Sequence, residues 1–226
     1  MTRRPLPSHF FGRPTPIVAR DLLGQELTLR TRRGERTVRI VETEAYLAHD
    51  PASHAFRGRT ARNGSMFGPP GTLYVFRIHQ VVCANITTRP GEAVLLRAGE
   101  PVHGALPNTS GPGRLCRALH ITMRDDGSSV RTGRIRLQRG RGRIGPIIVG
   151  RRVGIRRAAD RRLRFALNGN RWVSRPRPVG WRMRRAPRAT SVSPSGSFAS
   201  EGSLRTRRKR RLPAGGEKNG YRTGGR

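Results

Sequence analysis

The segment from Val38 to Tyr46 constrains the fold more than any other stretch, because it alternates like a β-strand and changes character along its length. Successive side chains of a strand point to opposite faces of the sheet. Val38, Ile40, Glu42, Glu44 and Tyr46 then share one face, which changes from apolar to acidic to aromatic. A strand that stays inside a core gives no reason for that change. We therefore expect a strand that begins in the core and ends in a pocket.

Acidic residues are scarce in this chain, so two glutamates within three positions stand out. The 226 residues include 13 Asp and Glu against 47 Lys and Arg, which gives a formal net charge of +34. Such a charge repels itself unless an anionic partner balances it. Nucleic acid is the commonest partner of that kind, and a membrane surface is the second. An arginine-rich proteome encoded by a GC-rich genome is a further explanation for part of the excess.

The length and cysteine content indicate one medium-sized intracellular domain with a tail. Cys83 and Cys116 have neither a metal-ligand spacing nor a CxxC spacing, so we expect buried free thiols in a reducing compartment. The N-terminus lacks the apolar run of a signal peptide, and the sequence has no apolar span of 18 residues. These features predict a soluble, cytoplasmic protein, associated with the nucleoid if the source is bacterial.

The N-terminal region carries the signals of a helix followed by a β-hairpin. Thr15 is a candidate N-cap, Pro16 suits the first helical position, and Gly24 suits the C-terminal stop. Residues 26–30 alternate as a strand, and residues 32–35 resemble the turn into the strand that carries the glutamates.

The middle of the chain alternates strands with a long loop. Residues 48–70 form a polar loop punctuated by Gly and Pro, a length that is usually functional or disordered. Strands are expected at 71–78, 81–86 and 93–97, a helix at 114–119, and short closing strands at 163–166 and 171–174. Residues 124–145 are basic, rich in Gly and too weakly patterned to assign.

The composition changes at Arg175. Residues 175–226 contain 15 Lys and Arg against 2 Glu and few apolar side chains, so they cannot offset the entropy cost of ordering. We therefore predict a folded domain over residues 1–174 and a disordered tail, rich in Arg, Pro, Ser and Gly, over residues 175–226.

The residue types around Glu44 suggest general-base chemistry in a basic groove. A glutamate kept ionised beside an arginine can orient and deprotonate a water molecule. Tyr46 on the same face and His54 in the following loop could enclose a planar ligand by stacking and hydrogen bonding. That combination suits a nucleobase that has been taken out of a helix.

Each of these residues also has a purely structural interpretation. Glu42 and Glu44 could pair with neighbouring arginines in a basic sheet, and Arg97 could be an ordinary ion-pair partner. His54 could be a solvated loop histidine. Phe76 could be a core aromatic like Tyr74. Asn85 could be a core amide with satisfied hydrogen bonds, since it follows the apolar pair at 83–84.

Seven short motifs in a fixed order give the chain a specific resemblance. They are Arg39–Leu47 (RIVETEAYL), Arg62–Phe67 (RNGSMF), Pro70–Val75 (PGTLYV), Cys83–Ile86 (CANI), Val94–Pro101 (VLLRAGEP), Gly111–Cys116 (GPGRLC) and Trp172–Ser174 (WVS). Together they resemble the alkyladenine DNA glycosylase family, also called 3-methyladenine or N-methylpurine DNA glycosylases. The similarity runs from about Leu6 to Ser174, with a poorly matching stretch near 124–145.

This resemblance implies a monofunctional glycosylase that flips an alkylated or deaminated purine, of the 3-methyladenine, 7-methylguanine or hypoxanthine type, out of duplex DNA. It then hydrolyses the N-glycosidic bond and so initiates base-excision repair. By position, Glu44 matches the catalytic base and Arg97 the arginine that holds the water and the carboxylate. Tyr46, His54 and Phe76 match the base pocket, and Phe76 replaces a common tyrosine. No metal, cofactor or Schiff-base lysine is implied.

The same resemblance implies further site residues in a monomer that acts on double-stranded DNA and not on membranes. Asn85 matches the asparagine that crowds the exocyclic amine of guanine. We also expect DNA contacts from Arg114 and from four residues of the 48–70 loop: Arg57, Arg59, Arg62 and Asn63. The expected fold is a single α+β domain with a curved antiparallel sheet, peripheral helices and a hairpin that enters the minor groove.

One departure from the family pattern concerns that hairpin. The family commonly places a Tyr-Gly pair there, and the tyrosine wedges into the space that the flipped base leaves. Residues 78–83 are one position shorter, and His79 is the candidate for the intercalating wedge. The shorter hairpin and the excess charge leave an alternative open, a catalytically impaired DNA- or RNA-binding protein on the same scaffold.

Overall fold

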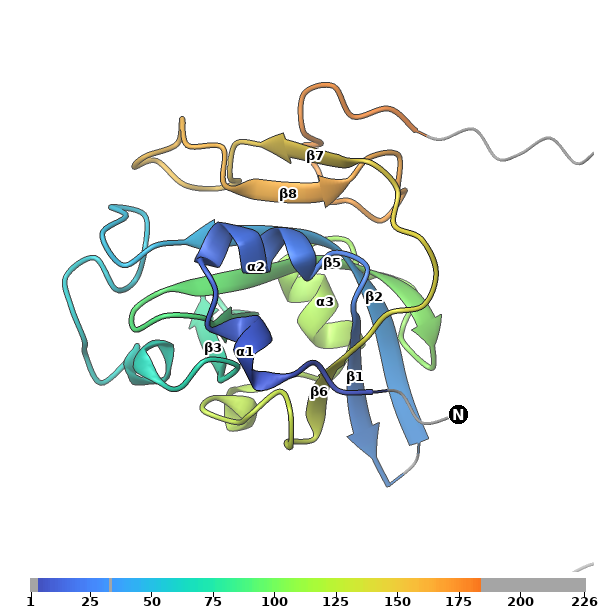
Figure 1. The fold of residues 1–226 in the computed structure, drawn as a ribbon, viewed down its shortest axis with the longest axis horizontal. Helices are drawn as coiled ribbons and strands as arrows, with labels where there is room; N and C mark the ends of the chain where they lie inside the picture. Colours follow the sequence, from blue (N-terminus) through green and yellow to red (C-terminus); the bar gives the residue numbers. More distant parts are fainter. Residues whose placement is uncertain (1–3, 33, 184–226) are drawn as a thin grey trace, which may run out of the picture. The chain divides into compact units, whose positions relative to one another are not determined.

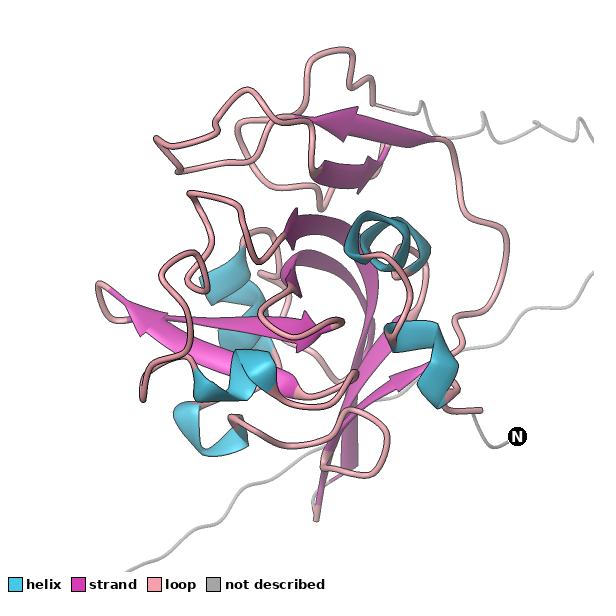
Figure 2. Cartoon of the chain, turned by 60° about the vertical axis from the view of Figure 1, so that its left-hand side comes forward, coloured by secondary structure: helices cyan, strands magenta, loops and turns pink. Residues whose placement is uncertain are grey.

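The computed structural model describes residues 4–32 and 34–183, and over this part of the chain eight strands form one antiparallel sheet (Figure 1). Six strands follow the order β3-β4-β5-β2-β1-β6, while β8 pairs with β2 and β7 pairs with β8. The strands are β1 (Glu26–Thr31), β2 (Gly34–Tyr46), β3 (Leu73–Ile78), β4 (Val81–Thr87), β5 (Ala93–His103), β6 (Ile135–Gln138), β7 (Ile147–Gly150) and β8 (Arg164–Leu167). In Figure 2 the long central strands bend strongly, which gives the sheet its curl. The predicted α+β fold with a curved antiparallel sheet is confirmed.

Short helices cover this sheet and close its core. They are α1 (Ser8–Phe11), α2 (Thr15–Asp21) and α3 (Pro112–Ala118), with 3₁₀ turns η1 (Gly64–Phe67) and η2 (Met123–Asp125). Helix α2 packs against β2, β5 and β8, whereas α3 packs against β4 and β5. Leu22, Leu27, Ile40, Leu96 and Leu115 are fully buried between these layers. Burying each such side chain contributes roughly 1.5–3 kcal/mol, so this apolar cluster is the main source of the fold's stability.

The helix predicted from Thr15 to Gly24 forms, but its ends differ from the prediction. Pro14 is the N-cap residue and Thr15 is already helical. The Thr15 hydroxyl instead donates to the Glu92 carboxylate and contacts the Thr88 hydroxyl, so a tertiary contact replaces the expected cap. The helix ends at Asp21, and Gly24 adopts a positive φ of 84° in the turn that leads into β1.

Strand β2 is the centre of the sheet and carries two adjacent irregularities. On one edge it pairs first with β1 and then with β8, while β5 runs along its other edge. The β2–β5 register passes from Ile40 to Glu42 and from Ala98 to Leu96, so Val41 and Arg97 are skipped as bulged residues. Bulges bend a strand and re-aim its side chains, and they gather near functional sites. The alternation predicted from Val38 to Tyr46 is therefore interrupted at Val41.

Several predicted segments differ from the observed ones near the C-terminus. Residues 171–174 form a turn rather than the predicted closing strand, because the sheet is closed there by β7 and β8. Strand β7 was not predicted, and β6 lies within the stretch 124–145 that the sequence pattern left unassigned. The remaining predicted strands and the second helix form with shifts at their ends.

Contacts with the sheet continue past Ser174, where the predicted tail begins. Arg164 Nη1 donates to the carbonyl of Pro176 over 2.8 Å, and Trp181 is partly buried against the core. Residues 184–226 of the predicted tail lie outside the described residues. In the described part of the chain, no helix has the length and apolar character needed to cross a bilayer.

Candidate active site

Glu44 is fully buried near the end of β2, and two hydrogen bonds and an ion pair converge on its carboxylate. The Tyr46 hydroxyl donates to Oε2 over 2.9 Å, and the backbone N–H of Val153 donates to Oε1 over 2.8 Å. Arg97 Nη1 lies 3.3 Å from the same Oε1. Because Glu44 and Tyr46 are two residues apart on one strand face, the local geometry of β2 places them together. The bulge at Arg97 brings the guanidinium opposite them.

Burial raises the pKa values of both Glu44 and Tyr46, which suits acid–base chemistry. Burial raises the pKa of Glu44 above its ordinary value of 4.5, while the charge of Arg97 and the bonds from Val153 and Tyr46 oppose that rise. Burial, followed by the neighbouring Glu44 charge, raises the pKa of the Tyr46 phenol. Tyr46 therefore remains protonated and acts as a donor to the carboxylate. A carboxylate with a raised pKa binds a proton more strongly than an exposed one, which favours a role as proton acceptor.

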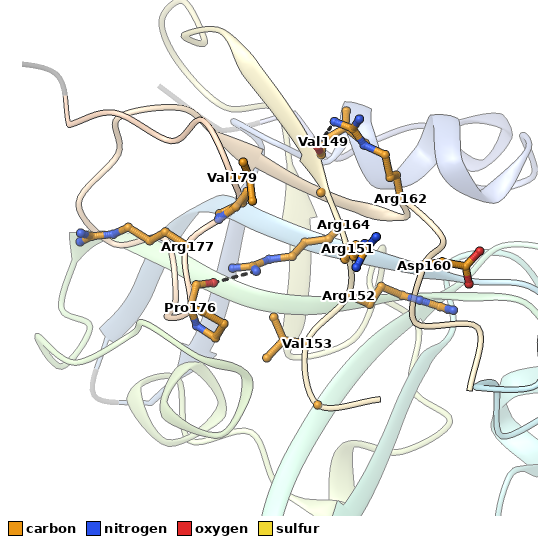
Figure 3. Close-up of a pocket in the computed structure, with 13 residues that line it drawn as sticks. Val149, Arg151, Arg152, Val153, Asp160, Arg162, Arg164, Pro176, Arg177 and Val179 are labelled. Carbon is orange, nitrogen blue, oxygen red and sulfur yellow. Dashed lines mark hydrogen bonds between the residues drawn. The ribbon is translucent and has the colours of Figure 1, made fainter. Parts of the chain in front are cut away.

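Glu42 supports Arg97 from behind. Its Oε1 accepts hydrogen bonds from Arg97 Nε at 3.0 Å and from Arg164 Nε at 2.6 Å. Ser174 donates its backbone N–H to Oε2 and its hydroxyl to Oε1, and it accepts a bond from Arg97 Nη2. Arg164 also donates through Nη1 to the Pro176 carbonyl, and Figure 3 shows this bond. Glu42 thus fixes the plane of the Arg97 guanidinium, and Arg97 faces Glu44.

A cavity of about 210 Å³ opens on the donor side of Glu44. Five residues predicted from the sequence line it: Tyr46, His54, Phe76, Asn85 and Arg97. Glu44 itself lies behind the wall that its partners Tyr46, Arg97 and Val153 form. The cavity is smaller than the roughly 300–1,000 Å³ clefts that bind drug-sized ligands, so it suits a single planar ring system.

An aromatic cluster forms one side of this cavity. The rings of His54 and Phe76 meet edge to face with centroids 4.4 Å apart, and His54 Nδ1 lies 2.9 Å from the Tyr74 hydroxyl. Burial lowers the pKa of His54, which keeps the imidazole neutral at neutral pH. Burial raises the pKa of Tyr74 to about 12, so its hydroxyl remains protonated. Tyr74, expected only in the core, is therefore also part of the cavity wall.

Asn85 and Cys83 lie across from this cluster on β4. Asn85 Nδ2 donates to the Tyr74 carbonyl over 3.1 Å, which fixes the orientation of the amide. Cys83 pairs with Phe76 across the two strands, and burial raises the pKa of its thiol to about 11. Both cysteines are free and buried, as predicted. Within residues 4–32 and 34–183, no group of three His, Cys, Asp or Glu side chains is placed to bind a metal ion.

The residues predicted to contact DNA divide into exposed and buried positions. Arg57, Arg59, Arg62 and Arg114 are exposed. Asn63 is only 3% exposed, and its amide holds the 48–70 loop together. Its Nδ2 donates to the carbonyls of His54 and Gly58, and its Oδ1 accepts from the Thr60 N–H and hydroxyl. Asn63 therefore positions His54, while the three loop arginines face outward.

His79 lies at the tip of a two-residue turn between β3 and β4. Ile78 pairs with Val81, and the two turn residues His79 and Gln80 have φ angles of 43° and 65°. A hairpin turn with both central residues at positive φ usually contains Asn-Gly or Gly, because a Cβ is strained there. The shortened hairpin therefore closes tightly and leaves His79 exposed at its end.

This strain predicts that Gln80→Gly stabilises the protein. Removing the Cβ at φ 65° should raise the free energy of unfolding by about 1 kcal/mol, since the left-handed conformation costs an L-residue roughly that amount. Urea denaturation measures the change. Gln80→Ala is the matched control, because it shortens the side chain but keeps the Cβ. An equal gain in both variants would show that the side chain, rather than the backbone conformation, is responsible.

Sequence reasoning missed the connector between β7 and β8, which contributes Val153 to the site. Its neighbour Arg152 is buried, stacks on the Tyr46 ring at 4.6 Å and pairs with Asp50 at 2.6 Å. Arg152 also donates to the Ala45 carbonyl over 3.2 Å, so the connector is fastened to the end of β2. Val153 acts through its backbone, which no side-chain pattern reveals. The closely spaced arginines at 151–164 were the only available signal.

Comparison with known proteins gives a consistent result. Residues 9–171 match the model of a family described as methylpurine-DNA glycosylase. The chain is 46% identical over 192 residues to a protein of Methanoculleus marisnigri named "Putative 3-methyladenine DNA glycosylase", an alignment covering 75% of this chain and 98% of that protein. A protein with the same name from Agrobacterium fabrum is 44% identical, and the alignment covers 75% of this chain and 92% of that protein. Another from an Anaeromyxobacter species is 45% identical, and the alignment covers 81% of this chain and 98% of that protein.

Proposed function

Because the chain belongs to the methylpurine-DNA glycosylase family, whose activity is hydrolysis of the N-glycosyl bond of 3-methyladenine in DNA, we propose that Glu44 is the general base of this reaction. The observation that carries the proposal is the convergence of Tyr46, Val153 and Arg97 on one buried carboxylate at the wall of a cavity the size of a base. The protein acts at the first step of base-excision repair.

The proposed step consumes one water molecule. The longest of the three contacts to Glu44 is that of Arg97 at 3.3 Å, so a water can enter between these two groups with the least loss of bonding. Glu44 takes a proton from this water while the water oxygen forms a bond to C1′ of the nucleotide. The N-glycosidic bond breaks, and its electron pair leaves with the purine. The products are a free base, an abasic site and a protonated Glu44.

The cavity wall supports a preference for damaged purines. A purine methylated at N3 or N7 carries a positive charge, which the faces of Tyr46 and Phe76 attract. It also leaves as a neutral base, so no acid is required. Asn85 opposes the exocyclic amine of normal guanine. The proposed substrates are 3-methyladenine, 7-methylguanine and hypoxanthine. The first and the last lack that amine, whereas 7-methylguanine keeps it and is proposed because its ring is cationic and leaves as a neutral base.

Access to the cavity requires the base to leave the duplex. We assign His79 at the exposed hairpin tip to the space that the base vacates. Arg57, Arg59, Arg62 and Arg114 supply contacts to the phosphate backbone, whereas Asn63 fixes the loop that presents the first three.

A base-release assay tests this function. Duplexes that carry a single 3-methyladenine, 7-methylguanine or hypoxanthine should accumulate alkali-labile abasic sites, while undamaged duplex should not. Asn85→Ala should increase release of normal guanine about tenfold, since removing one steric contact changes discrimination by at least that factor. Tight DNA binding without release of any of the three bases would instead support a catalytically impaired DNA-binding protein.

The pH dependence of release reports on Glu44 directly. A general base acts only when ionised, so the rate should fall as the pH falls through a pKa that burial places above 4.5. Tyr46→Phe removes a bond that lowers this pKa, so the midpoint should move to higher pH. Tyr74→Phe is the matched control, because it removes a hydroxyl from the same cavity without touching Glu44. Single-turnover rates across the pH range measure the midpoint, and an unchanged midpoint in Tyr46→Phe would contradict the assignment.

A further inference from the structure

The buried side chain of Arg152 joins three segments of the chain. Its Nη1 lies 3.2 Å from the Ala45 carbonyl at the end of β2 and 2.6 Å from Asp50 Oδ2 in the 48–70 loop. Its Nη2 donates over 3.4 Å to the carbonyl of Ala158, further along the same β7–β8 connector. The side chains of Asp50 and Arg152 are fully shielded from solvent. We call these two residues the buried pair.

On the loop side, the buried pair fixes the segment that leads to His54. Asp50 Oδ1 accepts a bond from the Ala52 N–H over 2.9 Å, and the Asp50 carbonyl accepts one from the Ser53 N–H over 2.7 Å. Burial alone would raise the pKa of Asp50, but the contact with Arg152 and the bond from Ala52 lower it, so the carboxylate is ionised. Ala52 and His54 both line the base cavity. The pair therefore anchors the loop where it forms the cavity wall.

On the side of Glu44, Arg152 holds the sources of both hydrogen bonds to the carboxylate. Its guanidinium carbon lies 4.6 Å from the centre of the Tyr46 ring, and the Tyr46 hydroxyl donates to Oε2 of Glu44. The next residue, Val153, donates its backbone N–H to Oε1. Figure 3 shows the side chains of Arg152 and Val153 leaving the connector in different directions. Arg152 does not line the base cavity, so it acts on the site only through its neighbours.

A role in stability alone does not account for the way Arg152 is placed. Its Nε is buried and has no hydrogen-bond partner among the described residues. Leaving a buried donor unpaired costs free energy, and a buried ion pair is often no more stable than apolar side chains of the same volume. The guanidinium keeps its face on the Tyr46 ring instead of satisfying Nε. Its orientation thus favours contact with the ring over complete hydrogen bonding.

We propose that Arg152 is a positioning residue for base release. It orients the two hydrogen-bond donors of Glu44, and through Asp50 it joins them to the loop that carries His54. This inference rests on the proposed function, because it takes Glu44 as the general base. The packing of a base against His54 and the proton transfer at Glu44 are then coupled through one side chain.

The test removes both charges of the buried pair. Asp50→Asn with Arg152→Met leaves no buried charge unpaired, and the new side chains keep most of the volume. Single-turnover release of hypoxanthine by the full chain should slow roughly 10–100-fold, the effect of misplacing groups that hold the reacting ones. The pH midpoint of the rate should rise, because the bonds from Val153 and Tyr46 lower the pKa of Glu44 and both become weaker.

The other charged groups near Glu44 stay in place in this double variant. They lie on the surrounding strands and are Glu42 on β2, Arg97 on β5 and Arg164 on β8. Within the described residues, no hydrogen bond or ion pair joins these three to the buried pair. Arg161, which is partly exposed, lies 3.9 Å from the carboxylate of the pair and is also retained. A moved midpoint therefore reports on the donors to Glu44.

Arg152→Lys tests the same point in a chain that keeps a positive charge beside Asp50. One ammonium cannot make all the contacts of the guanidinium, so the midpoint should rise by a smaller amount. If the double variant does not fold, Arg152→Lys decides the point alone. Asp125→Asn with Arg134→Met is the matched control, because it removes another Asp–Arg pair, 2.6 Å apart, that does not line the base cavity. This control should keep the parent midpoint, and thermal unfolding checks that each variant is folded.

A binding measurement tests the link between the buried pair and the loop. The full chain carrying Glu44→Gln is titrated with hypoxanthine-containing duplex and with undamaged duplex, with and without Asp50→Asn and Arg152→Met. Loss of the pair should reduce the preference for the lesion about tenfold, the effect of losing about one hydrogen bond to a charged group, because the loop that carries His54 is no longer anchored. An unchanged preference overturns the link through Asp50.

The outcomes separate this inference from the proposed function. A midpoint at the parent value in both Arg152 variants overturns the positioning role, whatever the loss of stability. A midpoint that moves in Tyr46→Phe but not in the Arg152 variants leaves Glu44 as the general base and refutes this inference alone. If Glu44→Gln releases base as fast as the parent chain, the proposed function fails, whereas a reduced lesion preference still supports the link of the pair to the loop.

Discussion

Glu44→Gln is expected to slow base release by about 10²–10⁴-fold, the contribution of a positioned general base, with only a small change in affinity for lesion-containing DNA. Glutamine has the shape of glutamate, and its amide oxygen can keep the hydrogen bond from Val153 and stay in contact with Arg97. Its amide nitrogen can donate to the Tyr46 oxygen, which reverses that bond. The site thus keeps its architecture and loses its proton acceptor. Single-turnover release and a binding titration measure the two quantities separately.

Glu42→Gln is the matched control for this prediction. It changes a second buried glutamate two residues earlier on the same strand, which contacts Arg97 but not the cavity. We expect a loss of stability from this variant and a smaller loss of rate. If Glu44→Gln released base as fast as the parent protein, Glu44 would not be the base. An equal loss in both variants would indicate that the buried network, rather than proton transfer, limits the reaction.

Arg97→Lys should produce the second-largest loss, about 10²-fold in the rate of base release. Lysine keeps the positive charge, but one ammonium cannot replace a planar guanidinium that bonds Glu42 and Ser174 and faces Glu44. The free energy of unfolding should fall by roughly 1–3 kcal/mol, because buried acceptors lose a donor. Single-turnover kinetics and urea denaturation measure the two effects.

Arg164→Lys separates catalysis from stability in this network. Arg164 is as buried as Arg97 and shares Glu42 as a partner, but its remaining bonds go to the carbonyls of Ser174 and Pro176. Its substitution should lower stability by a similar amount with a much smaller effect on rate. If both variants lost the same activity, the contact between Arg97 and Glu44 would have no special part in the reaction.

The sequence predicted those parts of the fold that local pattern determines. Alternating apolar residues located most of the strands, and the family motifs located Glu44, Tyr46, His54, Phe76, Asn85 and Arg97, five of which line one cavity with Glu44 directly behind it. Except for His54, which comes from the 48–70 loop, these residues lie close together because β2, β3, β4 and β5 are neighbours in the sheet. Functional side chains that lie on regular strands can therefore be recognised from the sequence pattern.

Other parts of the site depend on contacts between segments that are distant in the sequence, and the local sequence pattern does not predict them. The β2–β5 pairing skips Val41 and Arg97 near the point where β2 changes its other neighbour from β1 to β8. Thr15 has the sequence character of a helix cap but donates instead to Glu92. Asn63 has the polarity of a ligand-binding residue but is used inside its own loop. In each case a distant partner, invisible in the local sequence, decides what the residue does.

The backbone bond from Val153 to Glu44 also bears on how this enzyme tolerates mutation. Every residue type except proline supplies the same N–H, so position 153 can vary widely while the carboxylate keeps this donor. The length of the β7–β8 connector is constrained more strongly than its composition, because one inserted or deleted residue would turn a different N–H toward Glu44. Evolution of this segment is therefore expected to reject insertions and deletions and to vary at position 153, within the limits of the cavity wall, while Arg152 is held by its own side-chain contacts.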